Sequence, residues 1–219
     1  MRPRLVAESL YRFFRAGAEE TFALQGVGLQ VAPGEIVAVT GPSGSGKTTL
    51  LSCLAGLDEP DGGMVYIAGE RLSHQREHLR SRLRARYIGV LFQSGNLLEH
   101  LTVADNIRLV QRLSAGPDHR GAKDLLEHMG ITERAGALPR QLSGGEAARA
   151  GLAVALANRP AVVLADEPTG EVDGDTERRI LALLRERAAA GTSMVVVTHS
   201  RAVAAVADRV LRLRDGRWV

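Results

Sequence analysis

The sequence predicts an α/β fold in a single domain, and three observations support this class. The apolar runs VVL at 162–164 and MVVV at 194–197 do not alternate with polar residues, which favours a sheet covered on both faces. A glycine-rich loop at 41–48 separates a predicted strand from a predicted helix, and residues 93–156 look mostly helical. A chain of 219 residues, 45% hydrophobic, is long enough to bury the core of such a domain.

The segment before the glycine-rich loop predicts a β-hairpin. In LQGVGLQVAPGEIVAVTG, residues 24–41, alternating apolar residues indicate one strand, Pro33 and Gly34 the turn, and IVAV a buried second strand. After the loop, TTLLSCLAG predicts a helix with its leucines on one face and its end at Gly56. The order is strand, glycine loop, helix.

The middle of the chain predicts two strands separated by a basic helix. DEPDGGMVYIAGE, residues 58–70, is typical of a short strand between two turns, and IGVLF, residues 88–92, of an apolar strand. Between them, RLSHQREHLRSRLRARY predicts an arginine-rich amphipathic helix. We interpret its arginines as a solvated helix face in preference to a lipid-headgroup or nucleic-acid surface.

The remaining elements complete one domain with an insertion. Strands at AVVLA, residues 161–165, and SMVVVTH, residues 193–199, flank a helix at 175–191, and RVLRLRDGRWV predicts a terminal hairpin. The core and β parts are therefore expected at about 1–92 and 157–219, and the helical part at about 93–156.

Composition narrows the functional classes. The formal net charge of +3 does not by itself indicate nucleic-acid binding. No apolar run approaches the roughly 18 to 20 residues of a membrane span, and the N-terminus lacks the features of a signal peptide, so we expect a cytoplasmic chain. The single cysteine, Cys53, cannot form an internal disulfide, and we expect a packed residue rather than a reactive thiol.

The segment GPSGSGKT matches the pattern G-x-x-x-x-G-K-[ST] between a buried strand and a helix, the context that a phosphate-binding loop requires. Backbone N–H groups of such a loop converge on phosphates, and the helix N-terminus adds partial positive charge. Lys47 would reach the β- and γ-phosphates, and Thr48 would ligate Mg²⁺. A glycine-rich turn with an incidental lysine is the weaker interpretation. The predicted nucleotide contacts here are Gly41, Pro42, Ser43, Gly44, Ser45, Gly46, Lys47, Thr48 and Thr49.

Four further polar residues fit the needs of ATP hydrolysis. Asp166 and Glu167 end the strand AVVLA, where Asp166 is suited to hold Mg²⁺ and Glu167 to act as general base on the attacking water. Gln93 follows IGVLF and could place its amide near the metal and the water, and His199 follows MVVVT and could reach the γ-phosphate. Taken alone, Gln93 or His199 is more often a solvent-facing strand end, but the set favours catalysis. The predicted catalytic residues are Glu167, His199, Gln93 and Lys47, and the predicted metal ligands are Thr48, Gln93 and Asp166.

Five motifs in order carry a family resemblance. GPSGSGKTT, the glutamine in FQSGNLLEHLTVADN, LSGGE, LADEPTGEVD and VVVTHS together resemble the nucleotide-binding subunit of ATP-binding cassette (ABC) transporters over essentially the whole chain. RYIGVLFQSGNLLEHLTVADNI and ADEPTGEVD are most similar to the branch of lipoprotein-release, macrolide-export and cell-division ATPases. The resemblance implies a P-loop NTPase (RecA-like) core with an antiparallel β subdomain and an inserted α-helical subdomain.

The resemblance also explains LSGGE, which offers a second helix start to an anion. In this family two subunits pack head to tail, so Ser143, Gly144 and Gly145 of one chain face the ATP held by the other, and Asp173 lies across the same interface. Two positions depart from the family pattern: Glu146 stands where glutamine is usual, adding negative charge near the partner's triphosphate, and Val154 stands where a second basic residue is usual. The adenine-stacking aromatic aligns with Phe14, beside Phe13 and Tyr11, although a core role for any of these rings is equally favoured.

The leading function implied is an ATPase subunit, with ATP and Mg²⁺, that drives separate transmembrane permease subunits from the cytoplasmic face of the membrane. Gln93 and the loop 94–100 would receive the permease's coupling helix. The second ATPase subunit is expected to be another copy of this chain rather than a different cassette, and no nucleic acid is expected. The alternatives are an ATPase that signals mechanically through a membrane partner without transport, a soluble ABC ATPase acting on DNA or ribosomes, and an unrelated P-loop kinase.

Overall fold

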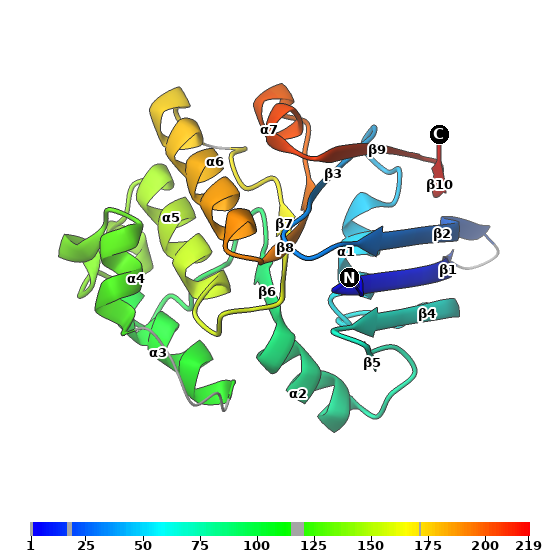
Figure 1. The fold of residues 1–219 in the computed structure, drawn as a ribbon, viewed down its shortest axis with the longest axis horizontal. Coiled ribbons are helices and arrows are strands. Elements are labelled where there is room, and N and C mark those ends of the chain that lie inside the picture. The colour runs from blue at the N-terminus through cyan, green and yellow to red at the C-terminus, as the bar shows by residue number, and fades with distance from the viewer. Residues whose placement is uncertain (1, 17–18, 115–120, 171) are drawn as a thin grey trace.

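The structure is a computed structural model that describes residues 2–16, 19–114, 121–170 and 172–219. Its strands form two sheets: a four-stranded sheet in the order β2-β1-β4-β5 and a six-stranded sheet in the order β10-β9-β3-β8-β7-β6. In Figure 1 the four-stranded sheet lies on the right, helices α3, α4 and α5 lie on the left, and the strands β3, β6, β7 and β8 lie between them. The α/β class and the separate antiparallel β part are therefore confirmed.

The two sheets differ in strand direction. The four-stranded sheet is antiparallel, whereas β3, β6, β7, β8 and β9 pair in parallel and only β10 runs against its neighbour β9. The strands are β1 (Leu5–Ala16), β2 (Glu19–Val31), β3 (Ile36–Thr40), β4 (Gly62–Ile67), β5 (Glu70–Arg71), β6 (Ile88–Leu91), β7 (Val162–Asp166), β8 (Ser193–Val197), β9 (Arg209–Arg214) and β10 (Arg217–Trp218).

The helices divide into those on the core and those of the insertion. On the core are α1 (Lys47–Leu54), α2 (Glu77–Tyr87), α6 (Gly174–Ala189) and α7 (Arg201–Val206). The insertion between β6 and β7 contains α3 (Val103–Leu113), α4 (Ala122–His128), the 3-10 turns η1 (Thr132–Arg134) and η2 (Pro139–Gln141), and α5 (Gly144–Ala155). The described part of 93–156 is helical without a strand, as its sequence predicts.

The parallel sheet is covered on both faces because successive residues of one strand pack on opposite sides. Val163 and Met194 belong to the hydrophobic cluster that includes α5 and α6. Leu164 and Val195, next in register, belong to the cluster with α1 and the antiparallel sheet. VVL and MVVV have no polar residues at alternate positions because both faces of these strands are buried, as the sequence predicts.

The predicted hairpin at 24–41 is wrong. The turn at Pro33 and Gly34 forms, but β2 joins the antiparallel sheet while β3 joins the parallel one. Both edges of β3 are occupied in parallel, with Val37 beside Val195 on β8 and beside Arg209 on β9. A turn signal between two apolar runs does not say which sheet each strand joins, and here the long-range pairing decided it.

The basic helix is shorter than predicted. It begins at Glu77 rather than at Arg71, because the preceding residues are tied to β4: Leu72 is buried, and the Ser73 hydroxyl accepts a hydrogen bond from the Val65 N–H at 2.9 Å.

The six-residue helix α7 was not predicted. No described helix is long and apolar enough to cross a membrane.

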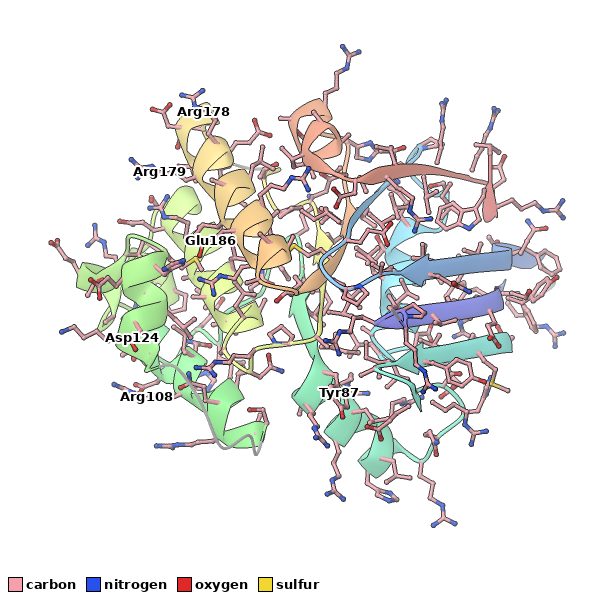
Figure 2. All side chains as sticks on the ribbon, viewed as in Figure 1. Tyr87, Arg108, Asp124, Arg178, Arg179 and Glu186 are labelled. Carbon is pink, nitrogen blue, oxygen red and sulfur yellow. The ribbon has the colours of Figure 1, made fainter. Side chains whose placement is uncertain are left out.

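Polar contacts attach the inserted helices to the core. His128 Nε2 of α4 lies 2.7 Å from Glu186 Oε1 of α6. Figure 2 shows Glu186 on the side of α6 toward the inserted helices, and Arg178 near the start of that helix. Elsewhere in the core, burial raises the pKa of the Cys53 thiol to about 12. Cys53 is therefore a packed residue, as expected.

Candidate nucleotide-binding site

The glycine-rich loop connects β3 to α1 and depends on two glycines that no larger residue could replace. Gly46 has a φ of 100° at the start of α1, and a Cβ there would lie 2.2 Å from the carbonyl oxygen of Ala23. At Gly41 a Cβ would lie 2.0 Å from the carbonyl oxygen of Leu213. The loop is therefore pressed against β2 and the end of β9, and its path is set by the surrounding strands.

Lys47 lies across this loop. Its side chain is largely buried, with an exposed fraction of 8%, and its Nζ donates hydrogen bonds to the carbonyl oxygens of Gly41 at 2.9 Å and Pro42 at 2.8 Å. Burial lowers the pKa of Lys47, while the carboxylates of Glu167 and Asp166 act in the opposite direction. The loop thus carries an ammonium group facing two carboxylates.

Thr48 and Asp166 form a pair of hard oxygen donors. The Thr48 hydroxyl donates to Asp166 Oδ2 at 3.1 Å, joining the first residue after the lysine to the end of β7. No group of three or more His, Cys, Asp or Glu among the described residues could hold a metal alone. A hydroxyl, one carboxylate and the nearby Gln93 amide nevertheless fit Mg²⁺, which takes few protein ligands and completes its shell with water and phosphate oxygens.

Glu167 is held in an unfavourable backbone conformation. Its φ is 47°, in the left-handed region that a glutamate rarely adopts, and its N–H donates to the carbonyl of Val197 at 2.9 Å. One carboxylate oxygen, Oε2, accepts from the Thr198 hydroxyl at 3.2 Å. The other, Oε1, is buried, accepts no hydrogen bond from the described residues and lies 3.7 Å from His199 Nε2. This arrangement leaves one oxygen of the half-buried carboxylate free to accept from another donor.

A cavity of about 710 Å³ joins these groups. Its lining includes residues of the predicted loop, both strand-end carboxylates and the two predicted polar residues, and also residues that the sequence did not indicate. The lining residues are Phe14, Thr21, Ala23, Ser43, Gly44, Gly46, Lys47, Thr48, Thr49, Gln93, Asp166, Glu167, Thr169, Gly170, His199 and Ser200. Gly41, Pro42 and Ser45 lie in the loop but do not line the cavity, and the first two accept hydrogen bonds from Lys47.

The missed residues had only weak sequence signals. Thr169 and Ser200 are linked through one carboxylate, because both hydroxyls donate to Glu177 Oε1, at 3.2 and 2.8 Å. Ser200 also caps α7, and a serine before a helix could have indicated it. Thr21 and Ala23 come from the antiparallel sheet, and a local pattern cannot predict that long-range approach.

Phe14 is the only one of the three predicted aromatic candidates that lines the cavity. Its side chain is exposed, and the guanidinium carbon of Arg12 lies over its ring, 4.7 Å from the centroid. Arg12 is in turn held by Asp58 through two hydrogen bonds of 2.9 Å. Phe13 instead packs with Phe22, at 6.1 Å between ring centroids.

The second glycine pair lies at the start of α5, away from this cavity. Ser143 caps the helix by accepting a hydrogen bond from the Glu146 N–H, and Gly145 packs close to Thr176 of α6. Asp173 caps α6 by accepting from the N–H groups of Asp175 and Thr176. In this single chain Ser143, Gly144, Gly145 and Asp173 do not line the cavity of the phosphate loop.

A second, smaller cavity of about 290 Å³ lies where the inserted helices meet the core, and we call it the lobe groove. It shares Gln93, Glu167 and Gly170 with the first cavity and contains Gly144 from the second glycine pair. Its remaining lining residues are Leu91, Phe92, Ser94, Gly95, Asn96, Leu97, Glu99, Pro139, Ala147, Ala148, Pro168 and Val172.

Known proteins are similar to this chain over most of its length. The family model for "ABC transporter" matches residues 24–170. The chain is 41% identical to the lipoprotein-releasing system ATP-binding protein LolD of Pseudomonas syringae over 219 residues, which cover 98% of this chain and 96% of that protein. It is 39% identical to the macrolide export ATP-binding/permease protein MacB of Azoarcus over 220 residues, which cover 99% of this chain and 34% of that protein.

A solved structure has the same fold. The dimeric post-hydrolysis state of the ATP-binding cassette MJ0796, bound to ADP and Pi, superimposes with a TM-score of 0.91 at 34% identity. The alignment covers 98% of this chain and 97% of the solved chain.

Proposed function

Since this chain belongs to the ABC transporter family as an ATP-binding cassette that hydrolyses ATP, we propose that it is the ATPase subunit of a membrane complex and that two copies bind ATP head to tail. Its permease is a separate polypeptide, and its cargo is of the lipoprotein, peptide or exported small-molecule kind. The observation that carries the proposal is the joining, in one cavity, of the phosphate loop, the pair Thr48 and Asp166, and the free oxygen of Glu167.

The phosphates of ATP bind at the glycine-rich loop. Loop amides and the N-terminus of α1 receive the phosphate oxygens, and Lys47 exchanges its two carbonyl contacts for the β- and γ-phosphates. Phe14 stacks on the adenine from the antiparallel sheet, with Arg12 behind its ring. Phe14 and the glycine-rich loop line the same cavity, so one nucleotide can contact both.

Thr48, Asp166 and Gln93 are the residues that would hold Mg²⁺. When bound, the ion supplies positive charge that neutralises phosphate oxygens. The hydrogen bond between Thr48 and Asp166 holds both oxygens at the end of the loop before ATP arrives.

Glu167 is the general base for the attacking water. Its Oε1 takes the water's proton, while its Oε2 stays fixed by Thr198. His199, whose side chain is exposed beside that carboxylate, contacts the γ-phosphate and orients it toward the water. The constrained backbone of Glu167 fixes the direction of the carboxylate, which is what a positioned base requires.

The second helix start completes the site of the partner chain. Ser143, Gly144 and Gly145, with Asp173, contribute to the nucleotide bound by the other copy, so closure of the dimer depends on intact ATP. None of the four lines the ATP cavity of its own chain, and Gly144 lines only the lobe groove, which supports this assignment. The likeness to a cassette solved as a dimer supports it as well.

The lobe groove receives a helix of the permease. In the MacB relative, whose name states both ATP-binding and permease, this chain matches about one third of the polypeptide, which leaves the rest for the permease part. Gln93 lines both the groove and the ATP cavity, so displacement of a helix in the groove is transmitted to the γ-phosphate end of the site. We place the chain at the cytoplasmic face of the membrane on this basis.

Glu167→Gln tests the two-chain site. Loss of the general base lowers hydrolysis by about 10² to 10⁴, so bound ATP persists, and sedimentation analysis is expected to show a dimer only with ATP. Glu167→Gln combined with Lys47→Ala is the control and should stay monomeric, because the phosphates lose their cation. A Glu167→Gln chain that is monomeric at high protein and ATP concentrations contradicts the head-to-tail proposal.

A further inference from the structure

The first turn of α5 contains a carboxylate whose two oxygens both have partners. Glu146 Oε2 accepts a hydrogen bond from the Ser143 N–H at 2.8 Å. Glu146 Oε1 accepts one from Arg134 Nε, also at 2.8 Å. The Ser143 N–H and then the Arg134 guanidinium lower the pKa of Glu146 to about 2, so the side chain is an anion at neutral pH.

Arg134 reaches Glu146 from a separate, anchored turn. It ends η1, where its own N–H donates to the carbonyl of Ile131 at 2.9 Å and its carbonyl accepts from the Ala137 N–H at 2.9 Å. The carbonyls of Ala135 and Ala137 accept in turn from the first two residues of α3. The backbone of Arg134 is therefore anchored to the inserted helices, and its guanidinium contacts Glu146 at the start of α5.

In the proposed dimer the start of α5 faces the triphosphate bound by the partner chain, so the charge of Glu146 affects ATP binding there. A negative side chain near the partner's triphosphate repels it, whereas an arginine already paired with that side chain cancels the repulsion. The Ser143 hydroxyl accepts from the Glu146 N–H, which leaves its own hydrogen for an acceptor outside the chain. In that dimer, the pairing of Glu146 with Arg134 reduces its repulsion of the partner's phosphate, and the Ser143 hydroxyl can donate a hydrogen bond to the same phosphate.

We propose that Arg134 is a positioning residue for the ATP bound across the subunit interface, acting through Glu146 to hold the start of α5 in a phosphate-accepting arrangement. The proposal rests on the two-chain function above. Arg134 itself does not contact the nucleotide. An ion pair with this degree of exposure usually contributes little to folding stability, so the effect belongs to ATP-dependent dimerisation and not to the fold.

The experiment measures the ATP concentration that gives half-maximal dimer in the Glu167→Gln background. Arg134→Gln is expected to raise this concentration about three- to tenfold, the effect of one uncompensated charge near a polyphosphate in a largely aqueous setting. The increase should shrink as salt approaches about 1 M, where the Debye length falls to about 3 Å. The thermal unfolding midpoint should stay that of the parent.

Two further variants separate positioning from other roles. Adding Glu146→Gln to Arg134→Gln should return the ATP requirement to near the parent value, because no charge then needs a partner. Arg140→Gln, which removes an exposed arginine from the neighbouring turn η2, should leave it unchanged.

The outcomes are distinguishable. An unchanged ATP requirement in Arg134→Gln, a loss that Glu146→Gln does not rescue, or an equal loss in Arg140→Gln overturns the role of Arg134 while the two-chain function stands. If the Glu167→Gln parent itself never dimerises with ATP, the two-chain function fails and the role of Arg134 fails with it.

Discussion

At the scale of single residues, Phe14 and Phe22 offer a matched comparison. Both rings are partly exposed on paired strands, at 44% and 51%, but only Phe14 lines the ATP cavity. Phe14→Ala is expected to raise the KM for ATP about tenfold with little change in kcat, because base stacking on an aromatic ring contributes about 1–3 kcal/mol. Steady-state ATPase assays measure this.

Phe22→Ala is the control for that substitution. It removes a ring of the same size from the same sheet and should leave the KM for ATP unchanged. Equal effects of the two variants would mean that the antiparallel sheet, and not adenine stacking, accounts for the loss.

Residue identity was predictable where a motif specified both type and spacing. Asp166, Glu167, Gln93 and His199 line one cavity with most of the loop residues, whereas Gly41, Pro42 and Ser45 do not line it. The left-handed backbone of Glu167 was not predictable, because glutamate rarely adopts it and only the surrounding strands impose it. The partner of Glu146 was not predictable either, since Arg134 lies in a separate 3-10 turn.

At the scale of elements, Asn106 ties the loop before α3 to the helix itself. The side chain is 4% exposed, and its Oδ1 accepts from the Leu98 N–H at 2.8 Å. Its Nδ2 donates to the carbonyls of Leu101 at 3.2 Å and Thr102 at 3.0 Å. The buried Asn106 amide therefore supplies hydrogen-bond partners to backbone groups of the turn at 98–102, which lies outside any helix or strand.

Asn106→Ala is expected to destabilise the fold by about 2 kcal/mol, because it leaves buried backbone groups without partners. Chemical denaturation measures the loss. Arg108→Ala on the same helix is the control, since Figure 2 shows Arg108 on the outer side of α3, where its ion pair with Asp105 is exposed. A stability loss no larger in Asn106→Ala than in Arg108→Ala would contradict this role for Asn106.

Element type was more predictable than element partnership. The parallel strands β7 and β8 were evident because burial on both faces leaves no polar alternation. The pairing of β3 was not, because a strand buried on both faces has the same local pattern whichever strands lie beside it. The start of α2 also depended on a contact outside the helix, between Ser73 and β4.

At the scale of the whole molecule, the lobe groove is the surface on which a permease would act. Leu98 lies between the groove residues Leu97 and Glu99, and its side chain is 46% exposed. The tagged chain, purified from gently solubilised membranes, is expected to carry a polytopic membrane protein identified by mass spectrometry. Leu98→Asp should lose that protein, because a charge replaces an apolar contact.

Leu57→Asp is the matched control, since Leu57 is exposed to the same extent, at 47%, outside the groove. It should retain the membrane protein. Recovery of only ribosomal or DNA-repair proteins with the unaltered chain would mean that the ATPase acts in a soluble machine.

The burial of Cys53 makes this chain well suited to fluorescence work. Its only thiol is enclosed by the core and largely protonated at neutral pH, since its pKa is raised to about 12. A cysteine introduced on the surface would therefore be the sole position that a maleimide dye labels, with the natural residue left in place. Donor and acceptor dyes on two such chains would report the opening and closing of the pair in real time, as a change in energy transfer.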